Sequence, residues 1–142
     1  MNPIDIKAKD AFDLLSKKIN SHLIDTRSEI EWKTTGIPDL SSINKETNLL
    51  NWGPVLDQSF FEQYKKFLLT SFNQKDSLFF ICRSGSRSFM AAKFAIEFGF
   101  KNSFNVYEGF HNENDQNWKK NLPVKIIYAS FTKFLEFLEL SI

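Results

Sequence analysis

The only cysteine of the chain, Cys82, opens a segment of small and cationic residues, Cys82-Arg83-Ser84-Gly85-Ser86-Arg87. Gly85 and the serines let the backbone curl tightly, so that successive N–H groups can point inward and form a nest for an anion. Arg83 and Arg87 bring two positive charges to the same place. Both effects favour a thiolate over a thiol. We therefore interpret Cys82 as a nucleophile, rather than as the small buried hydrophobe that a lone cysteine usually is.

The segments on either side place this cysteine between a strand and a helix. Residues 77–81 are apolar at nearly every position, as in a central parallel strand that is covered on both faces. A helix is predicted to follow, because apolar residues recur at helical spacing from Met90 to Phe98, and Gly99 then stands where helices commonly end. Ligands of open α/β sheets bind beyond the carboxyl ends of the strands, and Cys82 occupies that position.

Predicted helices and strands alternate along the rest of the chain. The helices are expected over residues 8–19, 28–33 and 58–70, and the further strands over residues 22–25, 48–52 and 104–107. The apolar face of the first helix is expected to run from Ala8 to Ile19, Ser28 is suited to cap the second helix, and Gly36–Asp39 has turn chemistry. This alternation indicates an α/β fold around a largely parallel sheet. Residues 126–142 predict a C-terminal helical extension, which docks on the domain, serves as a dimer contact or binds a partner.

The composition indicates one domain without a bulk charge. The chain has 142 residues, with 18 Lys and Arg against 17 Asp and Glu, so nucleic-acid binding through net charge is not expected. Two histidines and one cysteine are too few for a Cys/His zinc site, and we expect no metal and no cofactor. No apolar run approaches a membrane span, and residues 1–10 lack the apolar core of a signal peptide. We therefore expect a cytoplasmic monomer or weak homodimer with neither a nucleic acid nor a membrane as partner.

Several motifs together resemble the rhodanese family of single-domain sulfurtransferases. The segment Phe80–Ser88 is similar to the family's Cys-Arg-Ser-Gly-x-Arg-Ser active-site loop. The other matches, in chain order, are Asp25-Thr26-Arg27 with the acidic and aromatic residues up to Trp32, then Gly36-Ile37-Pro38, Val106-Tyr107-Glu108-Gly109-Phe110, Trp118 and Leu122-Pro123. Together they predict a single rhodanese-like domain over residues 1–125. Two positions depart from the family pattern, because no histidine precedes Ile37-Pro38 and Phe110 replaces a second glycine.

The resemblance implies both a fold and a chemistry. The fold would be α/β, with a central, mostly parallel sheet of about five strands flanked by helices on both faces. Cys82 would take a sulfane sulfur from a small anionic donor, thiosulfate or a persulfide, and carry it as a persulfide. Because the chain has no second cysteine, it cannot resolve this persulfide as an internal disulfide. The acceptor would then be cyanide, a small thiol or the thiol of a partner protein.

The resemblance also gives roles to the residues around the cysteine. Arg87 is the first candidate for binding the anion and bracing the loop, and Arg83 is expected to point outward as a charge at the mouth of the site. The N–H groups expected to cradle the sulfur are those of Ser84, Gly85, Ser86 and Arg87. Asp25 and Arg27 match positions that look structural, an ion pair that ties strand to loop, with Arg27 facing the pocket as the alternative.

Two other functions stay open at this point. Rhodanese-like domains also serve as non-catalytic binding modules, although those often lack the cysteine. Related folds with five residues between a cysteine and an arginine are phosphatases or arsenate reductases. Here four residues separate Cys82 from Arg87. The shorter loop makes a smaller ring, which suits one sulfur atom better than a phosphate group.

Overall fold

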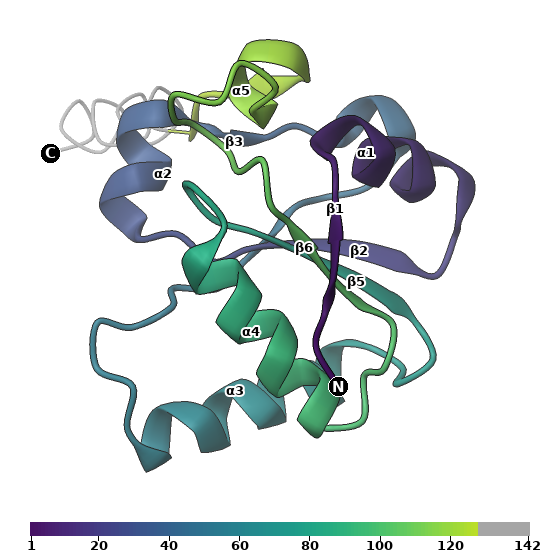
Figure 1. Cartoon of the computed structure of the whole chain (residues 1–142), viewed down its shortest axis with the longest axis vertical. Coiled ribbons are helices and arrows are strands. Elements are labelled where there is room, and N and C mark those ends of the chain that lie inside the picture. Colours follow the sequence, from purple (N-terminus) through teal and green to yellow (C-terminus); the bar gives the residue numbers. More distant parts are fainter. Residues whose placement is uncertain (128–142) are drawn as a thin grey trace, which may run out of the picture.

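Five parallel strands form the central sheet of the domain (Figure 1). The computed structural model describes residues 1–127. The strands are β1 (Ile4–Ile6), β2 (Ser21–Asp25), β4 (Asn48–Leu49), β5 (Ser77–Ile81) and β6 (Ser103–Val106). Their order in the sheet is β1-β6-β5-β2-β4, and every neighbouring pair is parallel. The predicted α/β fold around a parallel sheet is confirmed.

Strand β5 lies at the centre of the sheet and is its most completely buried strand. All five of its residues are buried, and it pairs with β2 on one side and with β6 on the other. Because side chains alternate along a strand, Phe79 and Ile81 enter one core while Leu78 and Phe80 enter the other. The strand ends at the carboxyl edge of the sheet, and Cys82 is the residue that follows it there.

Helices cover both faces of this sheet, as expected. They are α1 (Ala8–Lys17), α2 (Glu29–Thr35), α3 (Gln58–Ser71), α4 (Ser86–Glu97) and α5 (Trp118–Asn121), with a 3-10 turn at Ser41–Ile43. Helix α1 packs on one face through the buried Ala11 and Leu15. Helices α3 and α4 lie together on the other face (Figure 1), where the Tyr64 hydroxyl donates to the Ala91 carbonyl oxygen at 2.6 Å. The loop after Cys82 runs from β5 of this sheet directly into α4, so its two ends are fixed by these two elements.

A second, two-stranded sheet joins the segment after α2 to the end of the described chain. Strand β3 (Ile37–Pro38) pairs antiparallel with β7 (Val124–Lys125). Gly36 precedes it with a φ of 80°, and a Cβ at Gly36 would lie 2.6 Å from the Lys125 carbonyl oxygen, so this close approach requires glycine. The sequence predicted only a turn here, because a two-residue strand whose partner lies at the far end of the domain leaves no local pattern.

Three local expectations are corrected by the structure. Strand β1 was not predicted, because its three residues form an edge strand that is mostly exposed. Ile19 is 86% exposed, since α1 ends at Lys17 before the apolar face reaches it. Met90 is 41% exposed, because α4 turns its neighbour Ala91 toward the core instead. The structure describes only residues 126 and 127 of the predicted C-terminal extension (residues 126–142). The rest of this extension lies outside the described residues.

Within residues 1–127, none of the helices has both the length and the apolar character needed to cross a membrane.

Candidate active site

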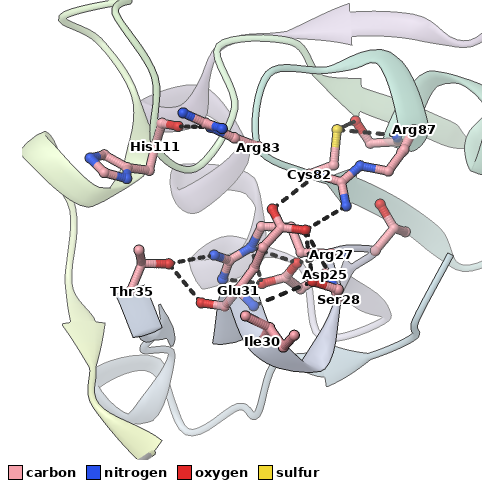
Figure 2. A network of polar contacts seen from close by, with 12 residues as sticks. Asp25, Arg27, Ser28, Ile30, Glu31, Thr35, Cys82, Arg83, Arg87 and His111 are labelled. Atoms are coloured by element: carbon pink, nitrogen blue, oxygen red, sulfur yellow. Dashed lines mark hydrogen bonds and ion pairs between the residues drawn. The ribbon is translucent and has the colours of Figure 1, made fainter. Parts of the chain in front are cut away.

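Cys82 stands between the carboxyl end of β5 and the N-terminus of α4 (Figure 2). The residue is only 1% exposed. Its Sγ accepts hydrogen bonds from the N–H of Gly85 at 3.1 Å and the N–H of Ser88 at 3.4 Å, and the Ser88 hydroxyl oxygen lies 3.2 Å away. These N–H groups belong to the start of a helix, where the helix dipole is positive. The two N–H groups therefore favour negative charge on the sulfur.

The turn that forms this cradle depends on its glycine. Gly85 has a φ of 103°, and a Cβ there would lie 3.0 Å from the Tyr107 carbonyl oxygen. Ser84 and Ser86 are exposed at the rim. Among the described residues, the hydrogen bonds to Sγ come from Gly85, which was predicted, and from Ser88, which was not. The available signal for Ser88 was its position in the first turn of the helix, where N–H groups are free to bind an anion.

Arg87 is engaged by a carboxylate of the protein itself. Two of its guanidinium nitrogens lie 2.7 and 3.0 Å from the two carboxylate oxygens of Glu31 on α2. Ser28 holds Glu31 in place, because the two residues form a capping box at the start of α2. Partial burial raises the pKa of Glu31, but hydrogen bonds from Arg87 and Ser28 outweigh this effect and lower the pKa to about 2. Arg87 thus braces the loop against α2, and Glu31 joins the site although the sequence reasoning did not select it.

The predicted ion pair between Asp25 and Arg27 is present and buried. Nε of Arg27 lies 3.0 and 3.1 Å from the two Asp25 oxygens, and a terminal nitrogen lies 2.8 Å from one of them. The other donors reach the Thr35 hydroxyl and the Gly36 carbonyl oxygen. The guanidinium carbon also lies 3.8 Å from the centre of the Phe110 ring. Arg27 therefore ties the end of β2 to α2 and to the closing loop, and each of its three nitrogens donates to a partner in the domain.

Arg83 is the exposed cation of the site. Its Nε donates to the His111 carbonyl oxygen at 3.2 Å (Figure 2). The Asn112 side chain donates to the Arg83 carbonyl oxygen at 2.7 Å, so the loop after β6 holds both the backbone and the side chain of this arginine. Across residues 1–127, no carboxylate forms an ion pair with Arg83. Its terminal nitrogens are thus available to a ligand.

Three cavities meet at Arg83. One of about 650 Å³ extends along residues 111–114, one of about 310 Å³ reaches Glu31, and one of about 550 Å³ reaches Trp52. Desolvation and neighbouring cations lower the pKa of His111, so this side chain is neutral near pH 7. Arg27 also lines the second cavity and Arg87 the third, but each is paired with a carboxylate, so the positive charge at these cavities that has no carboxylate partner within residues 1–127 is that of Arg83.

The fold and the site define a class of protein. A parallel sheet presents a cysteine at the carboxyl end of its central strand, inside a tight loop that leads into a helix, and this is the arrangement expected of a rhodanese-like domain. Comparison with known families agrees, because the Rhodanese-like domain family matches residues 8–115. The chain belongs to this family, which confirms the resemblance seen in the sequence.

Individual relatives and solved structures extend the same result. An uncharacterized protein of Rickettsia rickettsii is 38% identical over 124 residues, which cover 85% of this chain and 95% of that protein. An uncharacterized protein of Rickettsia prowazekii is 38% identical over 120 residues, which cover 82% of this chain and 92% of that protein. The crystal structure of Rv0390 from M. tuberculosis is 30% identical with a TM-score of 0.74, and the match covers 89% of this chain and 99% of that one. The polysulfide-sulfur transferase homodimer from Wolinella succinogenes is 23% identical with a TM-score of 0.62, covers 87% of this chain and 78% of that one, and shares the fold.

Proposed function

We propose that the chain is a sulfurtransferase, which moves a sulfane sulfur from thiosulfate or a persulfide donor through a persulfide on Cys82 to a thiol or to cyanide. The observation that carries the proposal is the cradle around Sγ, in which the N–H groups of Gly85 and Ser88 lie 3.1 and 3.4 Å from the sulfur. The Cys82 thiolate and the persulfide formed on it are both anions, and N–H donors stabilise both. Membership of the rhodanese-like family supports the same chemistry.

In the first half-reaction, the Cys82 thiolate attacks the sulfane sulfur of thiosulfate. A bond forms between Sγ and this sulfur while the bond from the sulfur to the sulfonate group breaks, and sulfite leaves with the electron pair. The thiolate and the thiosulfate dianion thus become a persulfide anion and a sulfite dianion, so charge is conserved. The inward N–H groups between Ser84 and Ser88 would hold the outer sulfur.

In the second half-reaction, a nucleophile attacks the outer sulfur of the persulfide. The bond to Sγ breaks, its electron pair returns to Sγ, and the Cys82 thiolate is regenerated. Because the chain has one cysteine, the nucleophile comes from outside, as cyanide, a small thiol or a partner protein's thiol. We place this reaction in the reducing cytoplasm, which keeps a lone thiol reduced, with the chain acting as a monomer or weak homodimer.

We assign the donor anion to Arg83, where the sequence alone favoured Arg87. Both carboxylate oxygens of Glu31 already occupy Arg87. Arg83 is exposed, lines all three cavities, and keeps its terminal nitrogens unpaired within residues 1–127. A planar guanidinium binds two oxygens of an oxyanion at once, which suits the sulfonate end of thiosulfate. Arg87 keeps its role in bracing the loop.

Mass spectrometry of the purified chain after incubation with thiosulfate tests the proposal directly. We expect one added sulfur atom on the peptide that contains Cys82, and its removal by cyanide as thiocyanate. The matched control is Cys82→Ser, which is nearly isosteric but a far poorer nucleophile, and it should stay unloaded with an unchanged melting temperature. A wild-type chain that stays unloaded with both thiosulfate and a persulfide donor would contradict the proposal and favour a non-catalytic binding module.

A further inference from the structure

A chain of hydrogen-bonding groups leads from the buried sulfur to the surface of β1. The Ser88 hydroxyl oxygen lies 3.2 Å from Sγ of Cys82 and 2.6 Å from Oδ1 of Asn105. The side-chain nitrogen of Asn105 in turn donates to the Asp5 carboxylate at 3.1 Å. Ser88 and Asn105 are 0% and 4% exposed, whereas Asp5 is exposed. Parallel pairing of β1 with β6 sets Asp5 beside Asn105 in register.

The directions of these hydrogen bonds follow from the chemistry of the groups. An ionised carboxylate only accepts hydrogen bonds, so Asp5 fixes the amide nitrogen of Asn105 on its own side. The amide oxygen of Asn105 then faces Ser88 and requires a donor. A hydroxyl has one hydrogen, and the short contact of 2.6 Å assigns that hydrogen to Asn105. Ser88 consequently presents oxygen lone pairs to the sulfur, which suit an S–H group and oppose a thiolate.

We propose that Asp5, acting through Asn105, sets the direction of the Ser88 hydroxyl and so restrains the reactivity of Cys82. For the sulfur to carry negative charge, the Ser88 hydrogen turns from Asn105 toward Sγ, and the buried amide oxygen of Asn105 loses its donor. Ser88 is then a catalytic residue that donates to the sulfur, and Asn105 and Asp5 are positioning residues. The role in turnover rests on the proposed sulfur transfer, since Sγ is a thiolate before the first half-reaction and again after the second.

Asp5→Asn releases the restraint without touching the core. The new amide offers an acceptor as well as a donor, so Asn105 is free to flip its amide and present a nitrogen to Ser88. The hydroxyl hydrogen of Ser88 then points at the sulfur. We expect alkylation of Cys82 in the full chain by iodoacetamide at neutral pH to become about two- to tenfold faster, the equilibrium factor of one hydrogen bond. At high pH, where the thiol is ionised in every variant, the rates should converge.

Ser88→Ala should change the same rate in the opposite direction. It removes the hydroxyl that turns toward Sγ and donates to it when the thiolate forms, and we expect alkylation at neutral pH to slow by about two- to tenfold. In the double variant Asp5→Asn with Ser88→Ala, the gain from Asp5→Asn should disappear, because the hydroxyl through which it acts is absent. Circular dichroism melting of each variant verifies the fold.

A charge effect is separated from the hydrogen-bond effect by two controls. Asp10→Asn, on the exposed first turn of α1, removes the same charge outside the network and should leave the rate unchanged. Salt at about 1 M shortens the range of charge interactions to about 3 Å but should leave the effect of Asp5→Asn in place. The other charged groups around the site are Asp25, Arg27, Glu31, Arg83 and Arg87, and every variant leaves them unaltered.

An unchanged rate in Asp5→Asn, an equal gain in Asp10→Asn, or a gain that persists without Ser88 would overturn the inference. Alkylation requires no sulfur donor and no acceptor. The inference can therefore succeed where sulfur loading fails, or fail where sulfur loading succeeds, and the two proposals are tested separately.

Discussion

Two arginine–carboxylate pairs lie beside the sulfur, and they differ chiefly in burial. The side chains of Arg27 and Asp25 are 1% and 0% exposed, whereas those of Arg87 and Glu31 are 33% and 27% exposed. In both pairs the guanidinium contacts both carboxylate oxygens. Away from water a broken pair leaves an uncompensated charge, while at a partly wet rim water takes over the lost contacts. The buried pair is therefore expected to contribute more to stability than the partly exposed pair.

This comparison also explains why a third arginine is left for the ligand. Arg27 and Arg87 are both neutralised by partners within the domain. Arg83 is held through its Nε and its backbone by the loop after β6, and this loop contributes carbonyl and amide groups to it rather than a carboxylate. The site consequently keeps one uncompensated positive charge at its mouth among the described residues.

The largest expected effect is on the buried pair. Asp25→Asn leaves the Arg27 guanidinium buried without a counter-charge, and we expect the free energy of unfolding to fall by about 3–5 kcal/mol. Urea denaturation measures this loss. The double variant Asp25→Asn with Arg27→Met carries no buried charge and should lose less than Asp25→Asn alone. A loss below about 1 kcal/mol for Asp25→Asn would mean that burial does not distinguish the two pairs.

The next effect concerns the unpaired arginine. Arg83→Gln should lower kcat/KM for thiosulfate. The variant is expected to lose about 1.5–3 kcal/mol of transition-state stabilisation, the usual contribution of a charged hydrogen bond. Thiosulfate:cyanide assays measure it, and the melting temperature should stay unchanged because Arg83 is exposed. Wild-type kcat/KM in Arg83→Gln would remove Arg83 from donor binding.

The exposed pair should show a smaller effect that depends on pH. Glu31 has a pKa of about 2 in the folded chain against an ordinary value of 4.5, so its contribution to stability is present above about pH 4.5 and is lost as the pH falls toward 2. Solvent screening reduces this contribution at a partly exposed pair to about 1 kcal/mol. Glu31→Gln should therefore be less stable than wild type by that amount at neutral pH and equal to it near pH 2. Denaturant unfolding across this pH range measures the difference in stability between Glu31→Gln and wild type. A difference that stayed constant with pH would count against the pairing of Glu31 with Arg87.

The smallest effect is expected for Arg87→Lys. Lysine keeps the positive charge but contacts Glu31 at one point instead of two, so stability should fall by about 0.5–1 kcal/mol. Because we assign donor binding to Arg83 and bracing of the loop to Arg87, kcat/KM should fall less than in Arg83→Gln. If Arg87→Lys proves the more damaging of the two in the thiosulfate assay, the roles of the two arginines are reversed.

Local contacts account for what the sequence predicted well. Gly85, three residues after Cys82, was expected to donate to the sulfur and does so, and the central strand before Cys82 is one apolar run. Ser28 caps α2 through Glu31, three residues away, which is likewise a local signal. Such interactions follow from backbone geometry and residue type, so a single sequence indicates them.

Contacts between distant segments were decided by the tertiary structure alone. The sequence favoured Arg87 over Arg83 for binding the anion, whereas the packing of α2 against the loop gives Glu31 to Arg87 and leaves Arg83 without a carboxylate partner among the described residues. In the same way, Asp5 meets Asn105 because β1 joins the sheet beside β6. Such contacts depend on the strand order and on how the helices pack, and these are set by the shape and burial of side chains over the whole domain. A local pattern of residue types therefore does not predict them. The sequence by itself indicated Cys82 and the tight loop that follows it, and the tertiary structure decided which charges surround them.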